Sequence, residues 1–159
     1  MLESVQEGLS LRSIVLDRSN LFFKILERDR GQWWDHWLFY TRTFGEIFDA
    51  YRHHFKLALD KEKEFVETFT RPELDRLKQL WEEKSDSIKS KTLELLTSGA
   101  ELRLPKSNFV VFFMGGLGLE LVSELHIKNE HVFFVDLVAF QRREGIEQIP
   151  QVVFNKLKK

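Results

Sequence analysis

The sequence contains no cysteine. This absence excludes disulfide bonds, thiol nucleophiles and thiolate metal sites, and it makes an intracellular, cytoplasmic protein the simplest expectation. The longest apolar runs, 109–114 and 132–135, are far shorter than the roughly 20 residues that a membrane-spanning helix needs. Residues 1–8 lack a basic start followed by an apolar stretch, so we predict neither a membrane segment nor a secretory signal.

The chain also lacks an excess of positive or negative charge, because 24 lysines and arginines are interspersed with 25 aspartates and glutamates. Such a chain has no large field to attract phosphate backbones or anionic lipid. We therefore expect no nucleic-acid partner.

Familiar catalytic motifs are missing as well. The chain has no Gly-x-Ser-x-Gly elbow and no His-Glu-x-x-His. Gly115, Gly116 and Gly118 follow an expected strand, as a phosphate loop would, but no Lys-Ser or Lys-Thr follows them. The alternatives are a tight turn or a close approach of the backbone to a neighbouring segment or ligand. We expect no catalytic residue and no cofactor.

What is present is apolar and aromatic: 43% of the residues are hydrophobic, 13% are aromatic, and phenylalanine occurs 15 times. This composition is typical of a folded chain with a real core. Aromatic residues recur every three or four positions from Trp33 to Phe55, which predicts one stripe on a single helix that starts near Gln32 and ends near Leu59. The arc is wide, since Trp34 and Phe39 extend it, so part of it can face a groove or a second subunit.

Other helix signals lie on both sides of this stripe. Thr70 and Glu73 match a capping box, and a long helix should run from Pro72 to about Thr97, with Ser98-Gly99 as its stop. Before the stripe, Ser19 or Asn20 should cap a short helix, and the residues preceding it fit helix or strand. The last helix should begin around Ile149, with Pro150 in its first turn.

After Pro105, the spacing of the apolar residues changes from one typical of helices to one typical of strands. Residues 109–114 predict a strand buried on both faces. Residues 120–127 and 131–140 predict a hairpin that turns at 128–130, with Asn129 in a left-handed conformation. We predict a single α+β domain over 1–159. A helical part (1–99) of three or four helices packs on the strand–hairpin–helix part (100–159), a small three-stranded sheet closed by a short C-terminal helix.

Two groups of side chains could hold a metal ion. The first is His126, Glu130 and His131 at the hairpin turn, and the second is Asp49 with His53 one helical turn apart. The plainer interpretation is ordinary hairpin surface and a solvated helix face. We adopt it and predict no metal site.

The order of these elements resembles the zincin class of zinc-dependent proteases. The resemblance is carried by Trp37–Tyr40 and Phe44–Tyr51, the strand and glycine turn Val110–Gly118, the hairpin end Val132–Leu137, and the helix entry Ile149–Phe154. It implies a zinc ion held by two histidines on the last helix, with a glutamate activating water. The corresponding positions here include Asn155, Lys156 and Lys159. A protonated lysine repels a divalent cation, and it can act as a ligand only after its pKa falls far enough for it to lose the proton. We therefore expect no hydrolysis by this chain alone.

Two functional hypotheses follow. In the first, the chain is a non-catalytic or truncated relative of zincin-like metallopeptidases that binds an extended peptide, with a groove that includes Trp33, Trp37, Tyr40, Gly115, Gly116 and Gly118. In the second, it is a helical interaction module that forms a homodimer through the aromatic face of residues 33–55.

Overall fold

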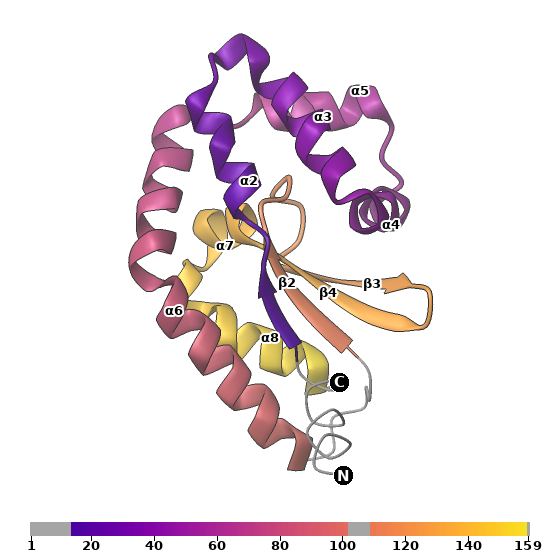
Figure 1. Cartoon of the computed structure of the whole chain (residues 1–159), viewed down its shortest axis with the longest axis vertical. Helices are drawn as coiled ribbons and strands as arrows, with labels where there is room; N and C mark the ends of the chain where they lie inside the picture. Colours follow the sequence, from indigo (N-terminus) through magenta and orange to yellow (C-terminus); the bar gives the residue numbers. More distant parts are fainter. Residues whose placement is uncertain (1–13, 102–108, 159) are drawn as a thin grey trace.

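The computed structural model describes residues 14–101 and 109–158, which fold into seven α-helices and one four-stranded sheet (Figure 1). The elements in chain order are β1 (Ile14–Asp17), α2 (Asn20–Phe23), α3 (Trp33–Thr43), α4 (Gly45–Phe55), α5 (Leu59–Glu67), α6 (Arg71–Glu101), β2 (Phe109–Met114), β3 (Val122–Ile127), β4 (Glu130–Asp136), α7 (Leu137–Arg143) and α8 (Ile149–Lys158). Short 3₁₀ turns at Lys24–Glu27, Arg30–Gln32 and Ile146–Gln148 join them.

The sheet has the strand order β1-β2-β4-β3. β1, β2 and β4 run parallel, and β3 pairs antiparallel with β4 at one edge. The predicted α+β class is confirmed, but the predicted three strands become four. Residues 14–17, inside the part expected to be helical, form the fourth strand against β2. The expected helical part (1–99) therefore also contributes one strand, at a position where the sequence fits helix or strand.

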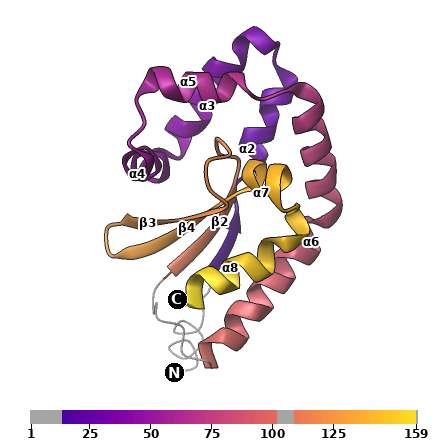
Figure 2. The same ribbon diagram turned by 180° about the vertical axis from the view of Figure 1, so that it is seen from behind.

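Helices cover the sheet on both faces and along the β1 edge. α6 runs beside β1, and α8 lies across one face, as Figure 2 shows. Trp81 of α6 donates from Nε1 to the Asp17 carboxylate of β1 at 3.0 Å and packs edge-on against Phe113 of β2. On the other face, Phe48 and Tyr51 of α4 pack on Phe134 of β4.

The aromatic stripe forms two helices and not one. Phe44 has φ −109° and ψ 50°, which ends α3, and Gly45 begins α4. This break lets α3 and α4 point in different directions, with α4 seen end-on in Figure 1. Trp37 of α3 and Phe48 of α4 still meet edge-on, so one aromatic core joins both helices.

A buried ion pair holds the three helices of this region together. Glu62 of α5 is 1% exposed and accepts hydrogen bonds from Trp37 Nε1 at 2.6 Å and from Arg52 Nε at 2.8 Å. Its neighbours come from α3 and α4, so the carboxylate is satisfied by both helices at once. This arrangement fixes the position of α4 relative to α3 and α5.

The expected helix ends are partly correct. Thr70 and Glu73 form the reciprocal capping box, with distances of 3.3 and 3.4 Å, and the last helix begins at Ile149. α6 continues past the expected stop at Ser98-Gly99 to Glu101. Ser19 is the N-cap residue of α2, but its side chain does not cap it. The Ser19 hydroxyl donates instead to Asp17 Oδ1 at 2.6 Å.

Two further corrections concern the hairpin. Lys128 (φ 57°), not Asn129, has the left-handed conformation in the turn. The strand predicted over 131–140 ends at Asp136, and Leu137 begins α7. Asp136 caps α7 by accepting hydrogen bonds from the backbone N–H groups of Val138 and Ala139, so the apolar run continues as a buried helix.

Substitution of Gly115 tests the packing of the glycine turn. A Cβ at Gly115 would overlap the ring of Phe22, whereas a Cβ at Gly45 would meet nothing within 4 Å. We expect Gly115→Ala to lower the free energy of unfolding by about 1–3 kcal/mol or more. Gly45→Ala, the control, should leave it unchanged or raise it by about 0.4–1 kcal/mol. Urea denaturation measures both, and equal effects would show that Phe22 yields freely.

Candidate functional site

The turn between β2 and β3 is held by side chains of the chain itself. The backbone N–H of Gly115 donates to the Tyr40 hydroxyl at 3.1 Å, and that hydroxyl donates to the Gly115 carbonyl at 2.7 Å. The N–H of Leu117 donates to the Tyr51 hydroxyl at 3.0 Å. These bonds leave the turn no free N–H at either position for a ligand.

Asp136 takes the two remaining N–H groups of the turn. Its carboxylate accepts from Gly116 at 3.0 Å and from Gly118 at 2.8 Å, in addition to the two N–H groups at the start of α7. The glycines are required, since a Cβ on Gly116 would overlap this carboxylate and Gly118 has φ 79°. The residues at 115–118 thus form a tight structural turn, and they do not cradle phosphate.

The buried polar groups of the turn have shifted pKa values. Burial raises the pKa of Asp136 to about 6, and the four backbone N–H donors oppose this rise. Burial, with the nearby Asp136 charge, raises the pKa of Tyr40 and of Tyr51 well above the ordinary value. Both tyrosines therefore remain neutral hydrogen-bonding groups. Asp136 was missed in the sequence, although an aspartate that precedes an apolar run is an N-cap signal.

A hollow of about 700 Å³ lies between α4 and β3. Its α4 wall consists of Glu46, Asp49, Ala50, His53 and His54, and its other wall consists of residues 124–128. Successive residues of a strand point to opposite faces of the sheet. A hollow that touches 124, 125, 126 and 127 must therefore follow the edge of β3, which the strand order leaves unpaired among the described residues.

An ion pair and a histidine–carboxylate contact join α4 to the hairpin and to the segment before β3. Glu46 of α4 contacts Lys128 of the hairpin turn at 3.3 Å, and His54 contacts Glu120, just before β3, at 3.2 Å. Between them lie the small side chain of Ala50 and the apolar side chains of Leu125 and Ile127. The hollow is thus a groove with polar ends and an apolar middle, which we call the α4–β3 groove.

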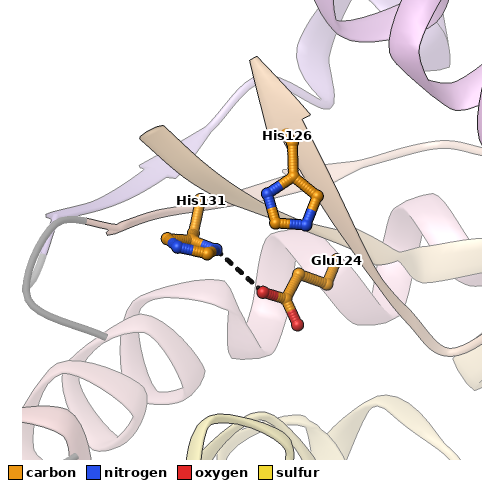
Figure 3. Close-up of side chains that lie close together, drawn as sticks. All are labelled: Glu124, His126 and His131. Carbon is orange, nitrogen blue, oxygen red and sulfur yellow. Dashed lines mark hydrogen bonds and ion pairs between the residues drawn. The ribbon is translucent and has the colours of Figure 1, made fainter. Parts of the chain in front are cut away.

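Side chains on the opposite face of the same hairpin form a second feature. Glu124 and His126 are two residues apart on β3, and His131 of β4 lies directly opposite His126. Their potential ligand atoms all lie within 4.8 Å of one another. His131 Nδ1 and Glu124 Oε2 are hydrogen-bonded at 2.8 Å, as Figure 3 shows. Among the described residues, this is the one such group of three.

The structure brings some of the metal-ligand candidates from the sequence together and leaves others apart. His126 and His131 meet, but their carboxylate partner is Glu124 and not Glu130, because Glu130 alternates to the other face of β4. Asp49 is 83% exposed and contacts Arg52 at 4.0 Å. Asp49 and His53 line the α4–β3 groove without a third ligand.

The predicted groove residues lie elsewhere. Trp33, Trp37 and Tyr40 are fully buried in the core, and Gly115, Gly116 and Gly118 are buried in the turn. None of the six lines the α4–β3 groove. In residues 33–55, Phe39 is the large apolar side chain that is mostly open to solvent, at 52%. A homodimer through this range stays a prediction, and Phe39 is the side chain it would have to use.

The segment that carries the zincin resemblance is the C-terminal helix. Asn155 and Lys158 of α8 are exposed, and Asn155 accepts a hydrogen bond from Gln151 at 3.0 Å. Lys159 lies outside the described residues. No family model, curated protein or solved structure matches the chain. Within residues 14–101 and 109–158, no helix combines the length and apolar character needed to cross a bilayer.

The titration of Asp136 should make stability depend on pH. Because burial raises its pKa from 3.8 to about 6, the folded state holds the proton more tightly than the unfolded state. The contribution of Asp136 is greatest below about pH 4 and is lost as the pH rises through about 6. Relative to Asp136→Asn, the free energy of unfolding should fall by on the order of 3 kcal/mol across this range.

Denaturation of both proteins at several pH values measures this difference. Asp75→Asn, on the exposed side of α6, controls for the loss of one negative charge. A difference between the wild-type protein and Asp136→Asn that stays constant from pH 4 to 7 would show that the four N–H donors cancel the effect of burial.

Proposed function

We propose that the chain is a peptide-binding protein that receives an extended segment of another protein in the α4–β3 groove. The observation that carries the proposal is the outer edge of β3, which pairs with no other described strand, beside a hollow of about 700 Å³. An edge strand presents unpaired backbone N–H and C=O groups, and an extended peptide can pair with them as an additional strand.

The second wall of the groove supports this mode of binding. A helix beside an open strand edge confines a peptide to the strand direction, and pockets along the helix can read alternate side chains. Ala50 leaves room on the helix side, and the half-buried Ile127 supplies apolar surface next to the buried Leu125. β3 is six residues long, so the peptide would pair over about that length.

The charges of the groove favour basic peptides. The α4 wall contributes two carboxylates, those of Glu46 and Asp49, and the hairpin turn contributes one lysine, Lys128. Charge complementarity raises the association rate and discriminates between partners. We therefore expect a peptide that alternates apolar and basic side chains to bind best. The proposal assigns no catalytic step, and the relation to zincin-like metallopeptidases stays a prediction that the proposal does not need.

Fluorescence anisotropy with labelled decapeptides tests the proposal. A decapeptide of alternating valine and lysine should bind saturably, and one of alternating valine and glutamate should bind at least about tenfold more weakly. A version with proline in place of every valine should not bind, because proline lacks the N–H donor that pairing needs. Equal binding of the proline peptide would show attraction by charge alone and contradict strand addition.

Variants in the α4 wall locate the binding site. Ala50→Trp should fill the groove and abolish binding, and Asp49→Lys should weaken it at least about fivefold by reversing one charge. The matched controls Gln79→Trp and Asp75→Lys, both on exposed positions of α6, should bind as the wild-type protein does. Circular dichroism verifies that each variant is folded. Unchanged binding by both groove variants would place the peptide elsewhere.

A further inference from the structure

We propose that Glu124, His126 and His131 form a binding site for one divalent transition-metal ion of the zinc type. The three residues offer two imidazoles and one carboxylate with ligand atoms within 4.8 Å of one another. This donor set suits Zn²⁺ and its neighbours in the first transition row, and it leaves at least one coordination position open. The inference is independent of peptide binding.

The hairpin backbone holds the ligands in place. Glu124 and His126 share a face because they are two residues apart on β3, and the register pairs His126 with His131. The connection between the strands is only Lys128-Asn129, so the two histidines cannot slide relative to each other without loss of the pairing. Sites on strands hold ligands more accurately than sites on loops.

Small side-chain rotations would bring the three ligands into tetrahedral geometry. In a tetrahedral site with metal–ligand distances of about 2.1 Å, the ligand atoms lie about 3.4 Å apart. The Glu124–His131 pair at 2.8 Å would open slightly, and any longer separation, up to the 4.8 Å limit of the group, would have to shorten. The exposed His126 can supply that movement by turning about its side-chain bonds. Figure 3 shows its ring beside the other two groups.

The hydrogen bond between Glu124 and His131 marks where the ion would enter. His131 Nδ1 lies 2.8 Å from Glu124 Oε2, so one proton lies between them. A metal ion would displace this proton and be bound by both atoms. Glu124 is 27% and His131 33% exposed, so the site is shielded on one side and open to the solvent from which the ion arrives.

Calorimetric titration of ZnCl₂ into the full, untagged chain tests the site. We expect one zinc ion per chain. Substitution of CoCl₂ should give the visible absorption of cobalt with nitrogen and oxygen ligands. His126→Asn, His131→Asn and Glu124→Gln should each weaken zinc binding at least about tenfold. Circular dichroism verifies the fold of each variant.

The matched controls lie close to the site. Glu130→Gln changes a carboxylate of the same hairpin on its other face, and the double change His53→Asn, His54→Asn removes the histidines of the α4–β3 groove. Both should bind zinc as the wild-type protein does. The proposal is overturned if the wild-type chain takes up no zinc, if any of the three ligand variants retains full affinity, or if the controls lose as much affinity as the ligand variants.

Failure of this test would leave the peptide proposal intact, because the valine–lysine decapeptide is measured without metal. Failure of peptide binding would likewise leave zinc uptake unaffected. In that case, the hairpin would contain a metal site next to an unoccupied strand edge.

Discussion

The carboxylate of Asp136 is the interaction on which the sheet end and the groove depend. Asp136 lies at the end of β4, and its carboxylate accepts hydrogen bonds from the glycine turn after β2 and from the start of α7. It therefore joins three segments of the chain. The backbone N–H of Asp136 also donates to the Leu121 carbonyl at 3.0 Å. That bond ties the chain immediately before β3 to the end of β4, next to the ladder that pairs the two strands.

Two tyrosines extend this constraint to the helices. Tyr40 of α3 and Tyr51 of α4 both bond to the backbone of the glycine turn, and Tyr51 also packs on Phe134 of β4. Buried hydroxyls need such partners, since an unpaired one costs about 1–3 kcal/mol. The distance between α4 and the hairpin is therefore set by a satisfied polar network and not by apolar contact alone.

Much of the fold could be predicted from local patterns. The capping box at Thr70 and Glu73 and the proline-marked start at Ile149 depend on neighbouring residues, and both are confirmed. The break at Phe44 is hidden by the aromatic spacing, which continues across it, although Gly45 is a local signal of a helix end. The residues of β1 fit helix or strand in the sequence, because the strand that pairs with them, β2, lies almost 100 residues away.

The site was harder to predict than the fold. The sequence indicates His126 and His131 as possible ligands, but closeness in sequence favours Glu130, next to His131, over Glu124 as their carboxylate partner. Strand alternation places Glu130 on the other face and brings Glu124 diagonally opposite. The α4–β3 groove has no sequence signature at all, since it arises where a helix and an edge strand approach without closing. The buried aromatic residues within 33–55 do not line the groove, because they pack in the core between α3 and α4.

The central claim is that the edge of β3 is free to pair with another chain. Amide hydrogen exchange, resolved residue by residue, tests it most directly. In an antiparallel pair every second residue of the edge strand points its N–H away from its partner. The account predicts alternating fast and slow exchange over residues 122–127 in the free protein, and slow exchange throughout when a peptide is bound. Uniformly slow exchange in the free protein would show that the edge is already covered and would contradict the account.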